Sequence, residues 1–181
     1  MQTDSKQKKI SFKNDGKGVK SVFIEGIKIV NGNHLPLVLS PTDIINKPEE
    51  LLYYVKKDKD TLLKLLNING AILLRGWGKS TPKIFSDIAN EFNMNKNFDM
   101  SCSAGPRLEV SPGVFTANEA PPSDSIPFHH EMAQCDKPPA IVIFFCDTPA
   151  KVGGRTPLIS SNLVAEYFLN KFPESAKKIL L

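Results

Sequence analysis

The pattern that most constrains the fold lies in the second half of the chain, where short apolar segments alternate with proline-rich turns. Residues 140–146, Ala-Ile-Val-Ile-Phe-Phe-Cys, combine β-branched and aromatic side chains and predict a strand in the protein core. Residues 113–116 and 125–131 predict two further short strands, and many of the 14 prolines lie between residues 106 and 157. Frequent turns between short strands favour a jelly roll over a helical bundle.

The remaining elements mix helices with strands. The expected strands are residues 22–24 and 27–30, which form a hairpin, residues 35–39, and the buried central strand 71–76; the expected helices begin at residues 46–50, 58, 80, 160 and 173. The sequence therefore predicts an α+β protein in which N-terminal helices pack outside a partial double-stranded β-helix, or jelly roll. Strands 113–131 and 140–160 supply only part of its two sheets, so we expect the C-terminal half of the jelly roll to be missing.

Positive charge is confined to the N-terminal tail. Residues 1–20 hold six Lys and two Asp, which accounts for the whole net charge of +4, and the rest of the chain has equal numbers of basic and acidic residues. We expect residues 1–20 to be a flexible basic tail and residues 21–181 to be one incomplete domain. Because no long basic helix accompanies the tail, neither nucleic acid nor a membrane surface is expected as a partner.

The cysteines and the apolar segments predict a protein of a reducing compartment, the cytoplasm. Cys102, Cys135 and Cys146 show no CxxC spacing, so the sequence predicts neither a disulfide framework nor a zinc site. The chain has no apolar N-terminal run of the kind that a secretory signal requires. No stretch approaches the roughly 18 consecutive apolar residues that span a membrane.

The tripeptide His129-His130-Glu131 carries candidate metal ligands. Alternate side chains of a strand point to the same face, so a strand over residues 125–131 places His129 and Glu131 together and His130 on the opposite face. An imidazole and a carboxylate on one face supply two of the three ligands of a 2-His-1-carboxylate iron site. Ordinary surface positions are the alternative, because the pattern HxE is common by chance.

Further motifs follow this tripeptide at a specific spacing. They are Ile126-Pro127-Phe128-His129-His130-Glu131-Met132, Pro138-Pro139, Ile143-Phe144-Phe145-Cys146 and Gly153-Gly154-Arg155-Thr156-Pro157. With these motifs the chain resembles the taurine dioxygenase (TauD/TfdA) family of Fe(II)/2-oxoglutarate-dependent oxygenases, within the clavaminate synthase-like superfamily. The resemblance extends over roughly residues 35–181.

The resemblance implies a role for each motif residue. His129 and Glu131 would ligate Fe(II), and Thr156 would donate a hydrogen bond to a carboxylate of the cosubstrate 2-oxoglutarate. Such an enzyme hydroxylates a small organic substrate and releases succinate and CO2. Three facial ligands leave three positions for the keto acid and O2, and glycines before the threonine let the backbone approach the cosubstrate. Arg107 and Asn118 either line the substrate pocket or lie on the surface, and the identity of the substrate stays open.

Two family residues have no counterpart in this sequence. The family places a second His ligand, and an Arg that pairs with the other 2-oxoglutarate carboxylate, on later strands. No His follows His130, Arg155 is the only Arg after Glu131, and His34 precedes the motif. Three explanations fit: a fragment or truncated form of an oxygenase, half of a split protein completed by a second chain, or a degenerate member. Two other functions also stay open, a catalytically inactive remnant or interaction module, and a zinc hydrolase.

Overall fold

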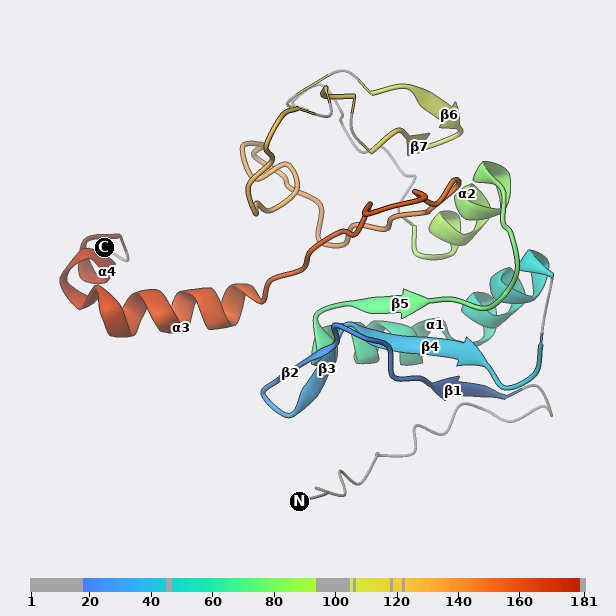
Figure 1. Cartoon of the computed structure of the whole chain (residues 1–181), viewed down its shortest axis with the longest axis horizontal. Coiled ribbons are helices and arrows are strands. Elements are labelled where there is room, and N and C mark those ends of the chain that lie inside the picture. Colours follow the sequence, from blue (N-terminus) through green and yellow to red (C-terminus); the bar gives the residue numbers. More distant parts are fainter. Residues whose placement is uncertain are drawn as a thin grey trace.

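The computed structural model describes residues 18–44, 47–93, 105, 107–117, 119–121 and 123–179. A three-stranded sheet in the first half has the order β1 (Val19–Ser21), β4 (Leu37–Pro41) and β5 (Ile72–Leu74). Strand β4 is antiparallel to β1 and parallel to β5. Figure 1 shows helix α1 (Pro48–Asn69), which connects β4 to β5, lying along one face of this sheet. The strand expected over residues 71–76 is therefore confirmed in the shorter form of β5, but β5 lies at the edge of the sheet and is only partly buried, so the expectation of a buried central strand is wrong. Strand β1 includes the last two residues of the expected tail.

The hydrophobic core lies between this sheet and helix α1. Leu39 of β4 and Val55 of α1 are completely shielded from solvent. Burying a side chain of this size stabilises the fold by roughly 1.5–3 kcal/mol. The core also contains Val19, Leu37, Tyr54, Leu62, Leu65, Trp77 and Ile88. Most of the well-buried apolar residues therefore belong to the first half of the chain.

Helix α1 replaces the two helices expected from residues 46–50 onward and over residues 58–67. Asp58 has non-helical dihedral angles, φ −114° and ψ 19°, so the expected break is present as a kink within one helix. Gly70 ends the helix with φ 77°, and its N–H donates to the carbonyl of Leu66 at 2.7 Å. A positive φ at this position is the reason a glycine suits the helix end.

The expected hairpin around residues 25–26 is wrong. Strand β2 (Lys28–Val30) instead pairs with β3 (Asn33–Leu35) through the turn Asn31-Gly32. Asn31 and Gly32 both have positive φ, 50° and 78°. A two-residue turn of this kind matches the twist of the strands that it joins, and Asn-Gly forms it readily.

Helix α2 (Pro82–Glu91) packs against a second hairpin, β6 (Glu109–Ser111) and β7 (Val114–Phe115). The side chain of Thr81 accepts a hydrogen bond from the N–H of Ile84, which caps the helix as its sequence predicts. The hydroxyl of Ser86 donates to the carbonyl of Pro112 at 2.6 Å, and Val114 is buried. The expected strand over residues 113–116 is thus confirmed in the shorter form of β7.

The strands expected over residues 125–131 and 140–146 are wrong, because neither segment forms a strand. Both are irregular, and Figure 1 shows the second one as an extended segment that reaches α2. A strand requires a neighbouring strand that satisfies its backbone N–H and C=O groups. No other segment in the described part of the chain pairs with either one.

The side chains of residues 140–146 nevertheless alternate between two environments. Ile143 and Phe145 are half-buried, whereas Val142 and Phe144 are exposed. The ring of Phe145 stacks on that of Phe85 in α2, with 5.3 Å between the ring centroids. One side of this extended segment therefore packs on the body, and the other side is uncovered.

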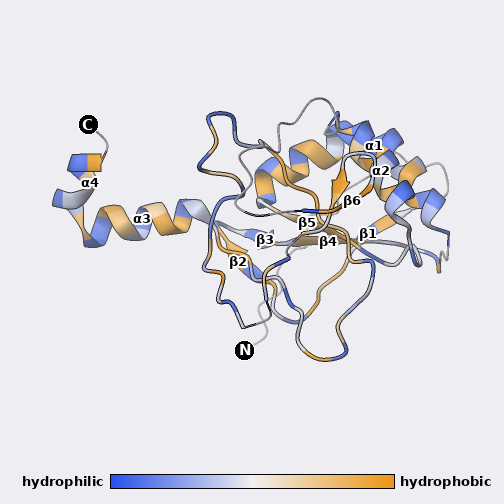
Figure 2. Cartoon of the chain, turned by 90° about the horizontal axis from the view of Figure 1, so that it is seen from above, coloured by the Kyte–Doolittle hydropathy of each residue, from blue (hydrophilic) through white to orange (hydrophobic). Residues whose placement is uncertain are grey.

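Helices α3 (Ser161–Lys171) and α4 (Pro173–Ile179) extend away from the rest of the molecule, as Figure 1 shows. Ser160 caps α3 by accepting a hydrogen bond from the N–H of Leu163, so the expected start of this helix is confirmed. No residue of α3 is buried. Figure 2 shows apolar residues along α3, and its exposed members include Leu163, Val164, Tyr167 and Leu169.

The described residues thus combine helices with three small sheets, which confirms the mixed α and β character predicted from the sequence. They contain no closed jelly roll. None of their helices has the length and apolar composition needed to cross a lipid bilayer.

Candidate metal centre

His129 presents one ring nitrogen to Glu131. Its Nδ1 lies 2.8 Å from the carbonyl oxygen of Pro127, and a carbonyl can only accept, so Nδ1 carries the proton of this hydrogen bond. In the neutral imidazole the other nitrogen, Nε2, keeps its lone pair, and it lies 3.7 Å from Oε2 of Glu131. This separation is too long for a hydrogen bond. The backbone hydrogen bond therefore favours the neutral tautomer that can ligate a metal through Nε2.

His130 faces a different part of the molecule. Its Nε2 lies 2.7 Å from the hydroxyl oxygen of Ser161, the first residue of α3. The two imidazoles thus diverge even though their segment is not a strand.

Glu131 is held by an arginine that lies 24 residues earlier in the sequence. Nη2 of Arg107 lies 2.5 Å from Oε1 of Glu131, and the two side chains are only 24% and 20% exposed. Directly after Glu131 the chain turns at Met132, which is buried and has a φ of 55°. The sequence did not predict this ion pair, because a single Arg far from the tripeptide carries no local signal.

The pair His129 and Glu131 fits a metal ion in chemistry and in spacing. A neutral imidazole and a carboxylate are ligands of a non-haem iron site. The 3.7 Å between Nε2 and Oε2 is less than two metal–ligand bonds of about 2.0–2.2 Å each, the lengths typical of zinc sites, so one ion can reach both atoms.

A third ligand does not join them among the described residues, where no group of three His, Cys, Asp or Glu converges. His34 lies in β3, and its ring meets the edge of Phe23 with 6.5 Å between centroids.

Thr156 stands apart from this pair. It is exposed and follows the turn at Gly153 and Gly154, whose φ angles are 71° and 68°. A Cβ placed on Gly154 would lie 2.6 Å from Cβ of Ala150, so only glycine fits there. In the described residues no hydrogen bond links Thr156 with His129 or Glu131. Asn118, which the sequence suggested as a possible lining residue of the substrate pocket, lies outside the described residues.

The cysteines differ from expectation at one position. Cys146 is a free, exposed thiol, whereas Cys135 is disulfide-bonded. The prediction that the chain has no disulfide is therefore wrong for Cys135, and Cys102 lies outside the described residues.

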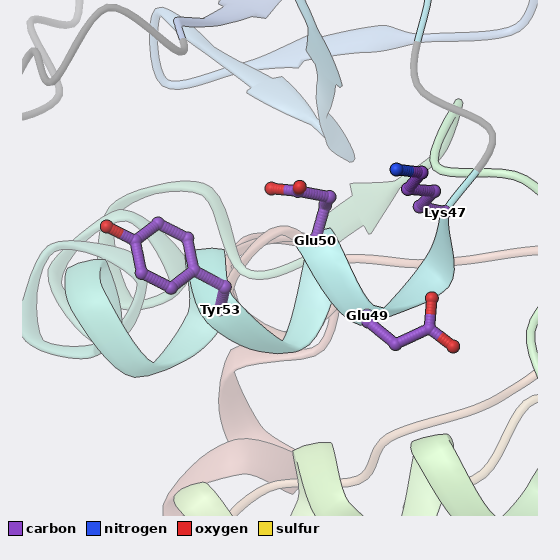
Figure 3. A pocket seen from close by; sticks show the side chains of 4 residues that line it. All are labelled: Lys47, Glu49, Glu50 and Tyr53. Atoms are coloured by element: carbon purple, nitrogen blue, oxygen red, sulfur yellow. The ribbon is translucent and has the colours of Figure 1, made fainter.

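A shallow pocket of about 250 Å³ lies elsewhere, at the start of α1. Lys47, Glu49, Glu50 and Tyr53 line it, and Figure 3 shows the two glutamates on opposite sides of the first helical turn. None of the candidate metal ligands contributes to this pocket.

His129 and Glu131 lie within a stretch that matches a known family. Residues 45–180 match the family described as taurine catabolism dioxygenase TauD, TfdA family, and the chain belongs to this family. It is also similar to a clavaminate synthase-like protein of Arabidopsis thaliana, with 38% identity over 125 residues. That match covers 69% of this chain and 38% of the relative, so the chain spans well under half of the relative's length. The family resemblance inferred from the sequence motifs is thereby confirmed.

Proposed function

We propose that this chain forms part of an Fe(II)- and 2-oxoglutarate-dependent dioxygenase that hydroxylates a small organic molecule and releases succinate and CO2. The observation that carries the proposal is the approach of His129 Nε2 to Glu131 Oε2, 3.7 Å apart, in a chain of a dioxygenase family. When bound, iron and 2-oxoglutarate supply the oxidising chemistry. The protein residues supply ligation, orientation and exclusion of water.

Each residue has a distinct part in this proposal. His129 offers Nε2 to the metal while the carbonyl of Pro127 fixes its tautomer. Glu131 offers Oε2 and neutralises part of the metal charge. Thr156 donates its hydroxyl hydrogen to a carboxylate of 2-oxoglutarate. The tight turn at Gly154, which a Cβ would obstruct, lets the backbone next to Thr156 approach the cosubstrate.

We also propose that further polypeptide, a continuation of the domain or a second chain, completes a jelly roll over the described residues. Two apolar surfaces support this. Phe144 and Val142 are 63% and 40% exposed on the uncovered side of their segment, and no residue of α3 is buried. Exposed apolar patches on soluble proteins commonly mark interaction sites, and these residues are where the added polypeptide would pack. The added polypeptide would also supply the third metal ligand, for which a second His suits Fe(II).

An inactive module that retains the fold is the alternative function. The observation that favours it is that no third ligand joins His129 and Glu131 within the described residues. The two functions predict opposite behaviour toward iron, which makes them separable by direct binding measurements.

The test is anaerobic addition of Fe(II) and 2-oxoglutarate to the purified chain. The proposed dioxygenase function predicts a visible metal-to-ligand charge-transfer band that disappears in His129→Ala. The matched control is His130→Ala, whose imidazole contacts Ser161, and this variant should keep the band. A folded chain that retains no Fe(II) in equilibrium dialysis, and whose stability His129→Ala leaves unchanged, would instead favour the inactive module.

A further inference from the structure

We propose that Arg107 is a positioning residue that holds the carboxylate of Glu131 ready to bind the metal through a single oxygen. This inference rests on the proposed metal-binding function. The two carboxylate oxygens have different neighbours. Oε1 lies 2.5 Å from Nη2 of Arg107, and Oε2 lies 3.7 Å from Nε2 of His129. The arginine thus occupies one oxygen and leaves the other directed at the second ligand.

The chemistry of the pair suits this role. A guanidinium has only N–H donors and stays charged, so Arg107 cannot itself ligate a metal ion. A charge-assisted hydrogen bond is stronger than a neutral one, and both side chains here are largely shielded from solvent. Partners that orient a metal ligand from outside typically contribute about 10–100-fold to metal affinity. Arg107 acts in this way on Glu131, as Pro127 does on His129.

The position of Arg107 is set by a hydrogen-bonded hairpin. The next residue, Leu108, donates its N–H to Oγ1 of Thr116 at 3.0 Å and accepts the N–H of Thr116 at 2.9 Å. The same hairpin is fixed to α2 by the bond from Ser86 to the carbonyl of Pro112. The irregular segment that carries Glu131 is therefore tied to regular structure through Arg107.

Binding of Co(II) to the full chain tests the inference, because Co(II) reports its ligand geometry through visible absorption. Arg107→Met keeps the length of the side chain and removes its charge and its donors. We expect Arg107→Met to lower the Co(II) affinity about tenfold or more. We also expect a changed visible spectrum, because the released carboxylate can bind through both oxygens. Arg107→Lys, which restores one charged donor, should recover part of the affinity. Arg75→Met, an exposed arginine after β5, is the control and should behave like the unaltered chain.

The outcomes separate this inference from the function on which it rests. If Arg107→Met binds Co(II) with unchanged or higher affinity while His129→Ala loses binding, the metal site stands and the positioning role is wrong. If the unaltered chain binds no Co(II), both proposals are wrong. If Arg107→Met does not fold, as judged by circular dichroism, Arg107→Lys decides: a partly lowered Co(II) affinity with a changed spectrum would support positioning, and an affinity and spectrum equal to those of the unaltered chain would overturn it.

Discussion

Nε2 of His130 lies 2.7 Å from the hydroxyl oxygen of Ser161, whereas Nε2 of the preceding residue, His129, lies 3.7 Å from a carboxylate oxygen of Glu131. Two identical side chains, adjacent in sequence, therefore have separate partners. His130 joins this segment to α3, and His129 faces Glu131, the second candidate metal ligand. Substitutions at the two positions should consequently have different effects.

We expect His130→Ala to leave Co(II) affinity unchanged and to increase amide hydrogen exchange in the first turn of α3. The reason is that His130 contacts Ser161 and not the metal pair. Both partners are exposed, so the free energy of unfolding should fall by no more than about 1 kcal/mol. Metal titration and hydrogen-exchange mass spectrometry measure the two effects. Lost Co(II) binding in His130→Ala would mean that the wrong imidazole has been assigned to the metal.

Gly154→Ala should weaken 2-oxoglutarate binding more than Gly153→Ala does. Both glycines have positive φ, so alanine introduces backbone strain of about 1–2 kcal/mol at either position. Only at Gly154 does the new Cβ also clash, 2.6 Å from Cβ of Ala150, since a Cβ at Gly153 meets nothing within 4 Å. The clash should displace Thr156, two residues on. Anaerobic titration of 2-oxoglutarate in the presence of Fe(II) measures the difference in affinity. Equal affinities of the two variants would contradict the proposed contact between Thr156 and the cosubstrate.

Local signals in the sequence predicted local structure well. Gly70 at the end of α1, Thr81 at the start of α2 and Ser160 at the start of α3 each act within a few residues along the chain. Their hydrogen bonds need no distant partner, so residue type and spacing suffice to predict them. The strand expected over residues 71–76 was also predictable, because its parallel neighbour β4 lies in the same half of the chain.

Features that depend on distant residues were not predictable in the same way. The apolar alternation of residues 140–146 indicates which side chains favour burial, but a strand also requires a neighbour, and none is present among the described residues. His129 and Glu131 approach each other as the sequence predicts, although their segment does not form the strand on which that prediction rested. The ion pair of Arg107 with Glu131 spans 24 residues, and nothing in the sequence between them indicates it.

Leu39→Ala should destabilise the chain by about 2–5 kcal/mol, because it removes a leucine that is completely buried between the sheet and α1. Ile29→Ala, in β2, is the matched control. The side chain of Ile29 is 64% exposed, so this substitution should lower the free energy of unfolding much less. Urea unfolding followed by circular dichroism gives both free energies of unfolding. Similar values for the two variants would contradict a core centred on β4 and α1.

Phe144 and Phe145 are neighbours in sequence with opposite surroundings, so polar substitution should affect them in opposite ways. Phe145 is half-buried and stacks on Phe85, so we expect Phe145→Ser to lower the free energy of unfolding by more than about 1 kcal/mol. Phe144 is 63% exposed, so Phe144→Ser should leave stability unchanged and reduce self-association.

Urea unfolding and analytical ultracentrifugation measure the two properties of these variants. If Phe144→Ser destabilises the chain as much as Phe145→Ser, both sides of the segment are already packed. The exposed face of Phe144 would then no longer support completion of the jelly roll by further polypeptide. If only Phe144→Ser lowers self-association, that face is accessible in the free chain and is suited to accept an additional strand or helix.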